Sequence, residues 1–250
     1  MVESSEACLK NNFDTDSSDI SDSAVLGICQ NVNKLLRWTG EYERAAQLLE
    51  PAIKRAGNAD SEDLANLLRQ VGIIRRRQRN ASGAKEAFEQ AKGITERLGT
   101  METSDGALLL INLGISEFES GGDPFNVMFA ARDLTSKLGL LDTNVGGLLF
   151  KWLGVFEFRR GNFEKADEFY KSAWSVYEKT GALPQLGKLK LDMGELKQAQ
   201  GDLESALALY KEALESQKKF GLLDSVESRQ IVTSVEDVEQ RLAIVDGTGL

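Results

Sequence analysis

The sequence predicts an all-α fold, a solenoid of five helical hairpins followed by a C-terminal helix. Its 250 residues include only three prolines, and long stretches without a helix breaker favour helices over strands. Five segments of similar pattern align without gaps, beginning at Ala45, Ala84, Pro124, Ala166 and Ala206, with spacings of 39, 40, 42 and 40 residues. A period of this length is typical of repeat proteins.

Each aligned segment has the pattern of one amphipathic helix, called helix B. A large apolar residue lies four positions into the segment and an alanine seven positions in, which places both on one helix face. These pairs are Leu49 and Ala52, Phe88 and Ala91, Met128 and Ala131, Tyr170 and Ala173, and Tyr210 and Ala213. Four segments end at a glycine, which stops a helix in the left-handed conformation. These glycines are Gly99, Gly139, Gly181 and Gly221.

A second helix, called helix A, is expected before each helix B. The turn between the two helices contains a glycine in four of the five units, and Arg79 replaces it in the second unit. These turn glycines are Gly40, Gly121, Gly161 and Gly201. Another glycine recurs seven residues earlier, within helix A, and Asn33 replaces it in the first unit. These helix A glycines are Gly72, Gly114, Gly154 and Gly194. Glycine in a helix costs about 1 kcal/mol relative to alanine, so we expect these glycines to allow close approach of a neighbouring helix.

This pattern resembles the tetratricopeptide repeat, a helix pair with Leu-Gly, Gly-x-[Phe/Tyr/Leu], Ala, aromatic and Ala positions at fixed spacing. The match is clearest in Val155–Gly181 and Met193–Gly221 and covers roughly residues 24–221. The unit is longer than the usual 34 residues of the family, as in kinesin light chains, cell-polarity adaptors and sensing domains of bacterial regulators. The resemblance implies a right-handed superhelix whose inner wall is formed mainly by the A helices.

The repeats predict the domain organisation. The five units are expected at residues 24–60, 61–101, 102–141, 142–182 and 183–221. Residues 1–23 form an acidic Ser/Asp-rich tail whose composition indicates disorder. Residues 222–245 form an amphipathic helix, which we expect to cap the solenoid. A coiled-coil seam for a weak dimer is the alternative for this helix. Residues 246–250 form a short tail.

Composition excludes several classes of function. The net charge is −9, with both ends acidic and the middle neutral, which argues against nucleic acid as a partner. The chain has no histidine and two cysteines, which excludes imidazole-based catalysis and argues against a zinc site or any other cofactor. No segment resembles a signal peptide or membrane span, so we expect a cytoplasmic protein without membrane association, to which a nuclear pool could be added.

Candidate binding residues follow from projecting each helix A onto the inner wall. The wall is expected to be basic at the start, apolar in the middle and acidic at the end, where Asp192 and Glu195 lie. The aromatic side chains in the middle of the wall would form an exposed apolar patch larger than a monomer usually tolerates, and such a patch indicates a binding surface. The predicted partner-binding residues are Asn31, Lys34, Arg69, Arg76, Ile111, Asn112, Phe118, Trp152 and Phe158. Burial of some of these side chains between adjacent A helices is the alternative interpretation.

The sequence therefore predicts a non-enzymatic adaptor or scaffold that binds a protein or peptide, specifically an amphipathic or partly acidic segment. A ligand- or peptide-sensing regulatory module is the second interpretation. A third possibility is that the acidic tail fills the groove itself through Phe13 and Ile20.

Overall fold

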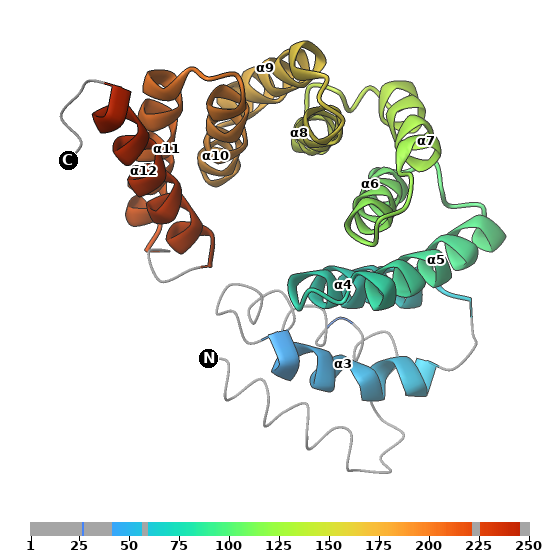
Figure 1. Cartoon of the computed structure of the whole chain (residues 1–250). Coiled ribbons are helices and arrows are strands. Elements are labelled where there is room, and N and C mark those ends of the chain that lie inside the picture. The colour runs from blue at the N-terminus through green and yellow to red at the C-terminus, as the bar shows by residue number, and fades with distance from the viewer. Residues whose placement is uncertain (1–26, 28–41, 57–59, 222–225, 246–250) are drawn as a thin grey trace. The chain divides into compact units, whose positions relative to one another are not determined.

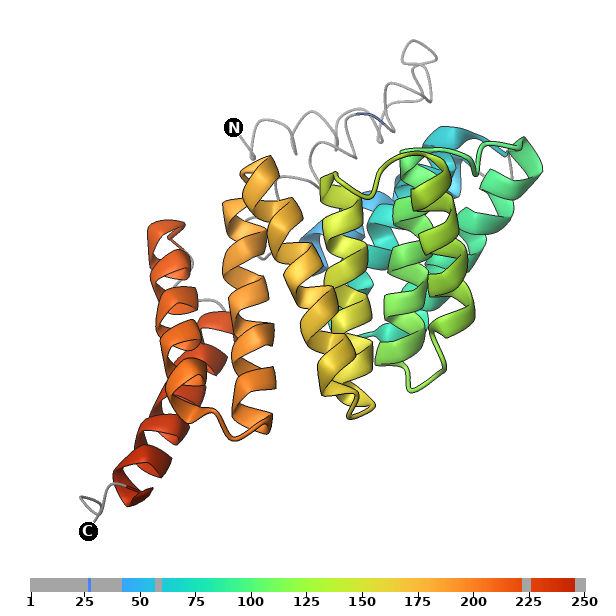
Figure 2. The ribbon, with the colours of Figure 1, turned by 90° about the horizontal axis from the view of Figure 1, so that it is seen from above.

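The computed structural model describes residues 27, 42–56, 60–221 and 226–245, and these form α-helices and turns without a β-strand (Figures 1 and 2). The ten described helices are α3 (Tyr42–Ala56), α4 (Glu62–Arg77), α5 (Ala81–Leu98), α6 (Ser104–Glu119), α7 (Phe125–Lys137), α8 (Asn144–Arg159), α9 (Phe163–Thr180), α10 (Leu183–Ala199), α11 (Leu203–Lys219) and α12 (Val226–Val245). The all-α prediction is confirmed.

The chain divides into two compact units, Met1–Leu138 and Gly139–Leu250. Unit 1 contains α3 to α7 and unit 2 contains α8 to α12, and within each unit every helix packs against the next one along the chain. Helices α4–α5, α6–α7, α8–α9 and α10–α11 form hairpins two to five. Helix α3 takes the place of helix B in hairpin one, whose helix A falls outside the described residues, so the count of five stays a prediction.

The recurring glycines of helix A lie directly against the large apolar residues of helix B, as the sequence predicts. A Cβ atom added to Gly72 would lie 2.6 Å from the Phe88 ring, and one added to Gly154 would lie 2.5 Å from the Tyr170 ring. Met128 stands against Gly114, and Tyr210 against Gly194, at similarly short distances. Real Cβ atoms do not approach other atoms so closely, so these positions exclude every side chain. Each hairpin is thus closed by one glycine and one large residue.

The turns also follow the predicted glycine pattern. The helix-ending glycines have φ values of 65° to 69°, and the three turn glycines between helices A and B have values of 79° to 82°. Arg79, which replaces the turn glycine in hairpin two, adopts the same left-handed conformation with φ of 62°. The hydrogen bond from Asn80 N to Arg75 O matches the one from Asn162 N to Glu157 O, both at 2.9 Å. The turn is therefore preserved at the cost of backbone strain.

Pro51 and Pro124 lie within or beside described helices. Helix α3 continues through Pro51, although proline in a helix interior removes a backbone hydrogen bond and usually kinks or breaks the helix. Helix α7 begins at Phe125, with Pro124 immediately before it. Asp123 still acts on this helix start, because its Oδ1 accepts a hydrogen bond from Phe125 N at 3.1 Å.

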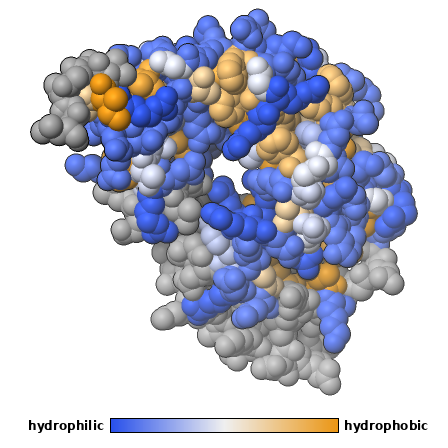
Figure 3. All heavy atoms as spheres, viewed as in Figure 1, coloured by the Kyte–Doolittle hydropathy of each residue, from blue (hydrophilic) through white to orange (hydrophobic). Residues whose placement is uncertain are grey.

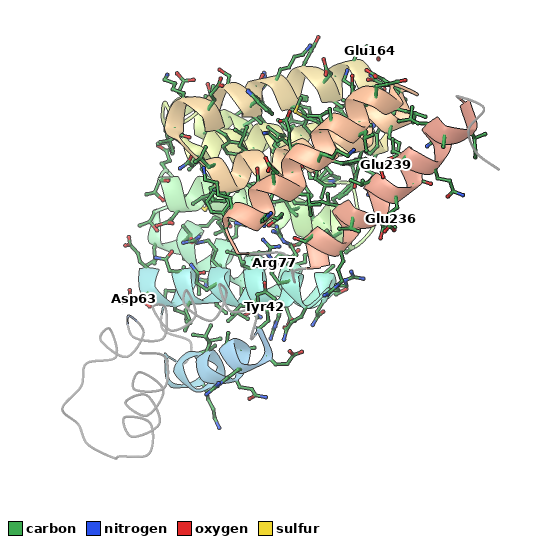
Figure 4. The ribbon with its side chains drawn as sticks, turned by 90° about the vertical axis from the view of Figure 1, so that its left-hand side faces the viewer. Tyr42, Asp63, Arg77, Glu164, Glu236 and Glu239 are labelled. Atoms are coloured by element: carbon green, nitrogen blue, oxygen red, sulfur yellow. The ribbon has the colours of Figure 1, made fainter. Side chains whose placement is uncertain are left out.

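Helix α12 packs against hairpin five. Its Ile231 and Val238 are buried in a cluster with Tyr210, and Val235 and Leu242 pack at the edge of this cluster. Glu239 of α12, labelled in Figure 4, forms an ion pair with Lys211 of α11 at 2.8 Å. The apolar stripe considered for a cap or a dimer seam is therefore occupied within the chain.

Candidate partner-binding site

In unit 1, the predicted arginines of α4 face polar residues of α6. The Arg69 guanidinium lies 2.9 Å from Asp105, and Arg76 lies 3.4 Å from the Asn112 side-chain oxygen and 3.7 Å from Glu119. Both arginine side chains are largely buried, and burial lowers the pKa of each, for Arg76 to about 10. These contacts form a polar ladder between neighbouring A helices. The charge of each arginine is thus compensated within the protein, while the buried Nε atom of Arg69 has no hydrogen-bond partner among the described residues.

Two other predicted residues of unit 1 lie inside the protein. Ile111 is completely enclosed, with no exposed surface, and Asn112 is 6% exposed. Asn112 donates a hydrogen bond to Leu108 O at 2.7 Å in addition to its contact with Arg76. The expectation that Ile111 faces a partner does not fit this placement, because its side chain is packed among neighbours. A projection of α6 alone, as the sequence allows, does not include the neighbouring helices that cover the Ile111 side chain.

The remaining predicted residues of unit 1 have different positions. Phe118 is half-buried near the end of α6. Asn31 and Lys34 lie outside the described residues. The structure therefore brings Arg69, Arg76 and Asn112 together but places them between two A helices.

In unit 2, a second polar ladder joins α8 to α10. Lys151 Nζ lies 3.2 Å from Asp192 Oδ2, and both side chains are largely buried. Among the described residues, no donor reaches this buried carboxylate oxygen in hydrogen-bond geometry, so the lysine compensates its charge without satisfying its acceptor. Burial raises the pKa of Asp192, and the nearby lysine opposes this shift only in part. An acceptor left in this state is costly, and this oxygen itself has almost no exposed surface.

Glu195 extends the ladder towards α12. Its Oε1 accepts a hydrogen bond from Gln230 Nε2 at 2.9 Å. Burial, followed by repulsion from Asp192, raises the pKa of Glu195. Asp192 and Glu195, the two acids that the sequence places at the end of the wall, therefore lie together. The sequence does not predict either of them as a partner-binding residue. Their spacing of three residues is common on helix surfaces, and only the contacts with α8 and α12 distinguish them.

Aromatic residues flank the unit 2 ladder. Lys151 Nζ lies 4.9 Å from the centre of the Trp152 ring, so one ammonium group contacts both the tryptophan and Asp192. Trp152 is partly buried, and its ring lies 5.9 Å from that of Phe156. Phe158 instead packs against Phe163 at 5.9 Å and borders the core cluster of hairpin four. Trp152 therefore keeps part of its surface exposed beside the ladder, whereas Phe158 has mainly a packing role.

The rest of the described surface offers little alternative chemistry. The face shown in Figure 3 is largely hydrophilic, with hydrophobic residues in scattered groups. Within the described ranges, acidic and sulfur-bearing side chains do not gather in a group that could hold a metal ion. None of the helices in the described part of the chain is both long enough and apolar enough to cross a membrane.

Comparisons with known proteins agree with this architecture. Residues 147–219, which lie in hairpins four and five, match the family model of the tetratricopeptide repeat. A comparison with curated proteins gives no match. The predicted resemblance to this repeat is confirmed for that segment by the family model, and for the fold by solved structures.

Three solved structures show the likeness in fold. BtubC (BKLC) from P. vanneervenii is 17% identical with a TM-score of 0.64, and the alignment covers 88% of each chain. TPR-like repeats of a putative kinesin light chain from Podosopora anserina are 14% identical with a TM-score of 0.58, over 80% of this chain and 98% of that one. The Rap conjugation gene regulator of plasmid pLS20, in complex with the Phr* peptide, is 14% identical with a TM-score of 0.70, over 97% of this chain and 73% of that one.

Proposed function

We propose that this chain is a protein-interaction module that holds a peptide segment of a partner against the A helices of unit 2. The tetratricopeptide fold typically serves as a non-enzymatic scaffold, and similar folds bind peptides, as in the Rap regulator in complex with Phr*. Fold alone does not identify a binding site, so the proposal depends on the local chemistry of α8 and α10.

The observation that carries the proposal is a partly exposed tryptophan beside the buried ion pair of Lys151 and Asp192. Lys151 contacts both groups, so the charged pair and the ring lie next to each other on this wall. A peptide that places an apolar side chain on Trp152 and a polar group near the exposed part of the ion pair would contact both. Tryptophan is frequent among the residues that dominate binding energy at interfaces. The favoured partner segment is therefore apolar with a nearby polar group, in place of the acidic end expected for unit 1.

A capture experiment with matched variants tests this function. Wild-type protein, Trp152→Ala, Asp192→Asn and the control Lys171→Ala would each be used as bait, with thermal unfolding as a check on folding. Lys171 is 71% exposed on α9 and only pairs with Asp167 one turn earlier, so its loss leaves the wall intact. We expect a partner that binds the wild type and the control but not the two wall variants. A partner retained equally by all four proteins would contradict the proposed site.

A peptide-gated regulator is the second candidate, favoured by the likeness to the Rap regulator over 97% of this chain. The two candidate functions differ in how peptide binding affects the rest of the protein. A regulator should change hydrogen exchange in helices far from the bound peptide, whereas a scaffold should show protection only at α8 and α10. Hydrogen exchange with and without the captured peptide distinguishes them.

A further inference from the structure

Hairpin two differs from other repeats at the turn that leads into its helix B. Where α3, α9 and α11 begin, the sequence reads Gly-x-x-Glu-x-Ala, which places a glutamate in the first turn of each helix. These glutamates are Glu43, Glu164 and Glu204. Where α5 begins, the sequence is Arg-x-x-Ser-x-Ala, with Arg79 in place of the glycine and Ser82 in place of the glutamate.

The start of α5 therefore lacks a negative charge that suits its position. The N-terminus of a helix carries a partial positive charge, so an acid in the first turn is stabilising. Helix α5 has no acid there, and the side chains of Arg77 and Arg79 are exposed just before it. Arg75 also reaches its first turn, because its Nη1 donates a hydrogen bond to Gly83 O at 3.1 Å. Ser82 thus lies where both the backbone and nearby guanidinium groups favour a negative charge.

The spacing of the arginines indicates which enzyme would supply this charge. Arg77 and Arg79 precede Ser82 by five and three residues, and all three side chains are exposed. In an extended segment, side chains two positions apart point to the same side, so both arginines would face one surface of an enzyme. Arginine pairs with carboxylates in bidentate geometry, and kinases select their substrates by such charge patterns. The segment therefore fits a protein kinase with an acidic substrate cleft.

We propose that Ser82 is a phosphorylation site for an arginine-directed protein kinase, and that the phosphate takes the place of the glutamate in the other repeats. In the transfer, Ser82 Oγ forms a bond to the γ-phosphorus of ATP. The bond from this phosphorus to the oxygen that bridges it to the β-phosphate breaks, and ADP leaves. The hydroxyl proton passes to a carboxylate base of the kinase. The modified side chain carries a charge of about −2 at neutral pH.

The turn before α5 has features that allow it to enter an enzyme cleft. Arg79 holds the left-handed conformation with φ of 62°, which is strained for a residue with a side chain. Helix ends also open locally at a lower free energy than the packed core. None of residues 77–83 is fully buried, and the first residue of α5 without exposed surface is Ala84. Transient opening of this turn thus presents Ser82 with both arginines while the core contacts of α5 stay in place.

Phosphorylation of the full-length chain tests the site. The protein is incubated with a purified arginine-directed kinase, ATP and Mg²⁺, and modified residues are located by mass spectrometry. Ser82 should be modified, whereas Ser104, which is also exposed in the first turn of a helix, lacks both arginines and should not. Arg79→Gly should lower the initial rate about tenfold or more, because a bidentate charged contact is lost. Arg77→Gln, which leaves the turn itself unchanged, should lower the rate in the same direction.

Hydrogen exchange tests what the phosphate does. After phosphorylation, the amides of residues 84–88 should exchange about two- to five-fold more slowly, the range expected for a negative charge at a helix start. Ser82→Glu restores the residue of the other repeats and should slow exchange in the same way. The control Gln90→Glu adds an equal charge at an exposed position in the middle of α5 and should not.

Each part of the proposal can fail. An unmodified Ser82 in the intact chain would overturn it, and a synthetic peptide of residues 75–88 would show whether the closed turn or the sequence is the reason. Equal modification of Ser82 and Ser104, or unchanged rates in both arginine variants, would show that the arginines do not direct the enzyme. Unchanged or faster exchange after phosphorylation would show that the phosphate does not replace the glutamate. None of these results depends on the proposed wall of unit 2.

Discussion

At the scale of residues, each hairpin depends on one small and one large residue that face each other. A glycine of helix A and a large residue of helix B occupy one space, and the partner is Phe88, Met128, Tyr170 or Tyr210. The three aromatic partners are almost completely buried, and burial raises the pKa of Tyr210 to about 12. Because the space is filled from helix B, any side chain added on helix A must displace a core residue.

The first prediction compares two glycines within helices. Gly154→Ala should lower the free energy of unfolding by about 1–3 kcal/mol, because the new Cβ would lie 2.5 Å from the Tyr170 ring. Gly93→Ala should raise it by about 0.5–1 kcal/mol, because its Cβ meets only the flexible end of Arg97 at 3.3 Å. Urea denaturation of both variants measures the difference. Equal effects of the two substitutions would contradict the packing argument.

The second prediction concerns the strained turn at Arg79. Arg79→Gly should raise the free energy of unfolding by about 0.5–1 kcal/mol, because glycine adopts a φ of 62° without the cost of a side chain. Gly161→Ala, at the equivalent turn with φ of 79°, should lower it by about 1 kcal/mol. Chemical denaturation of both variants measures these opposite shifts. A destabilised Arg79→Gly variant would indicate that the arginine side chain contributes more than its backbone costs.

At the scale of elements, helix starts differ in how they are capped. Helices α4, α6 and α8 each begin after a Ser or Thr that accepts a backbone hydrogen bond, whereas α10 follows Ala182 and has proline in its first turn. A helix start without a cap leaves N–H groups unsatisfied by the chain. We therefore expect the start of α10 to be less stable than the starts of α4, α6 and α8.

The third prediction restores the cap. Ala182→Ser should raise the melting temperature, since Ala182 stands immediately before the first helical residue and a side-chain cap contributes about 0.5–2 kcal/mol. Thr143→Ala, the reciprocal change in hairpin four, should lower the melting temperature by a comparable amount. Differential scanning calorimetry compares the two. If Ala182→Ser were destabilising, the packing of this alanine in the core cluster would outweigh the cap.

At the scale of the whole molecule, the repeat pattern predicts more of the fold than of the site. Glycine spacing located the turns and helix ends, because glycine at these positions reflects a backbone or packing requirement in each repeat. Side-chain partners across helices could not be predicted, because Arg69 and Asp105 are 36 residues apart and their contact depends on how hairpins stack. The unsatisfied oxygen of Asp192 likewise follows from exact geometry, which the sequence alone does not contain.

The fourth prediction concerns pH and the acidic ladder of unit 2. Burial raises the pKa of Asp192 and of Glu195 above their ordinary values of 3.8 and 4.5, although Lys151, Arg159 and Lys188 oppose the shift at Asp192. The folded state therefore binds these protons more tightly than the unfolded state does. The resulting stabilisation is fully present below the unfolded pKa values and is lost as pH rises through the raised folded values.

Wild-type stability should therefore increase on acidification from pH 7 towards the ordinary carboxyl pKa values of 3.8 and 4.5, relative to an Asp192→Asn, Glu195→Gln double variant. Asp60 and Asp202 have lowered pKa values and are exposed, so their opposite contribution is lost only below the ordinary aspartate value of 3.8. Hydrogen exchange at both ends of this pH range places the effect, which should appear in Gly139–Leu250 and not in Met1–Leu138. Parallel pH profiles for wild type and double variant would mean that the two carboxyls are solvated in solution, and the buried ion pair beside Trp152 on which the proposed site depends would then not exist.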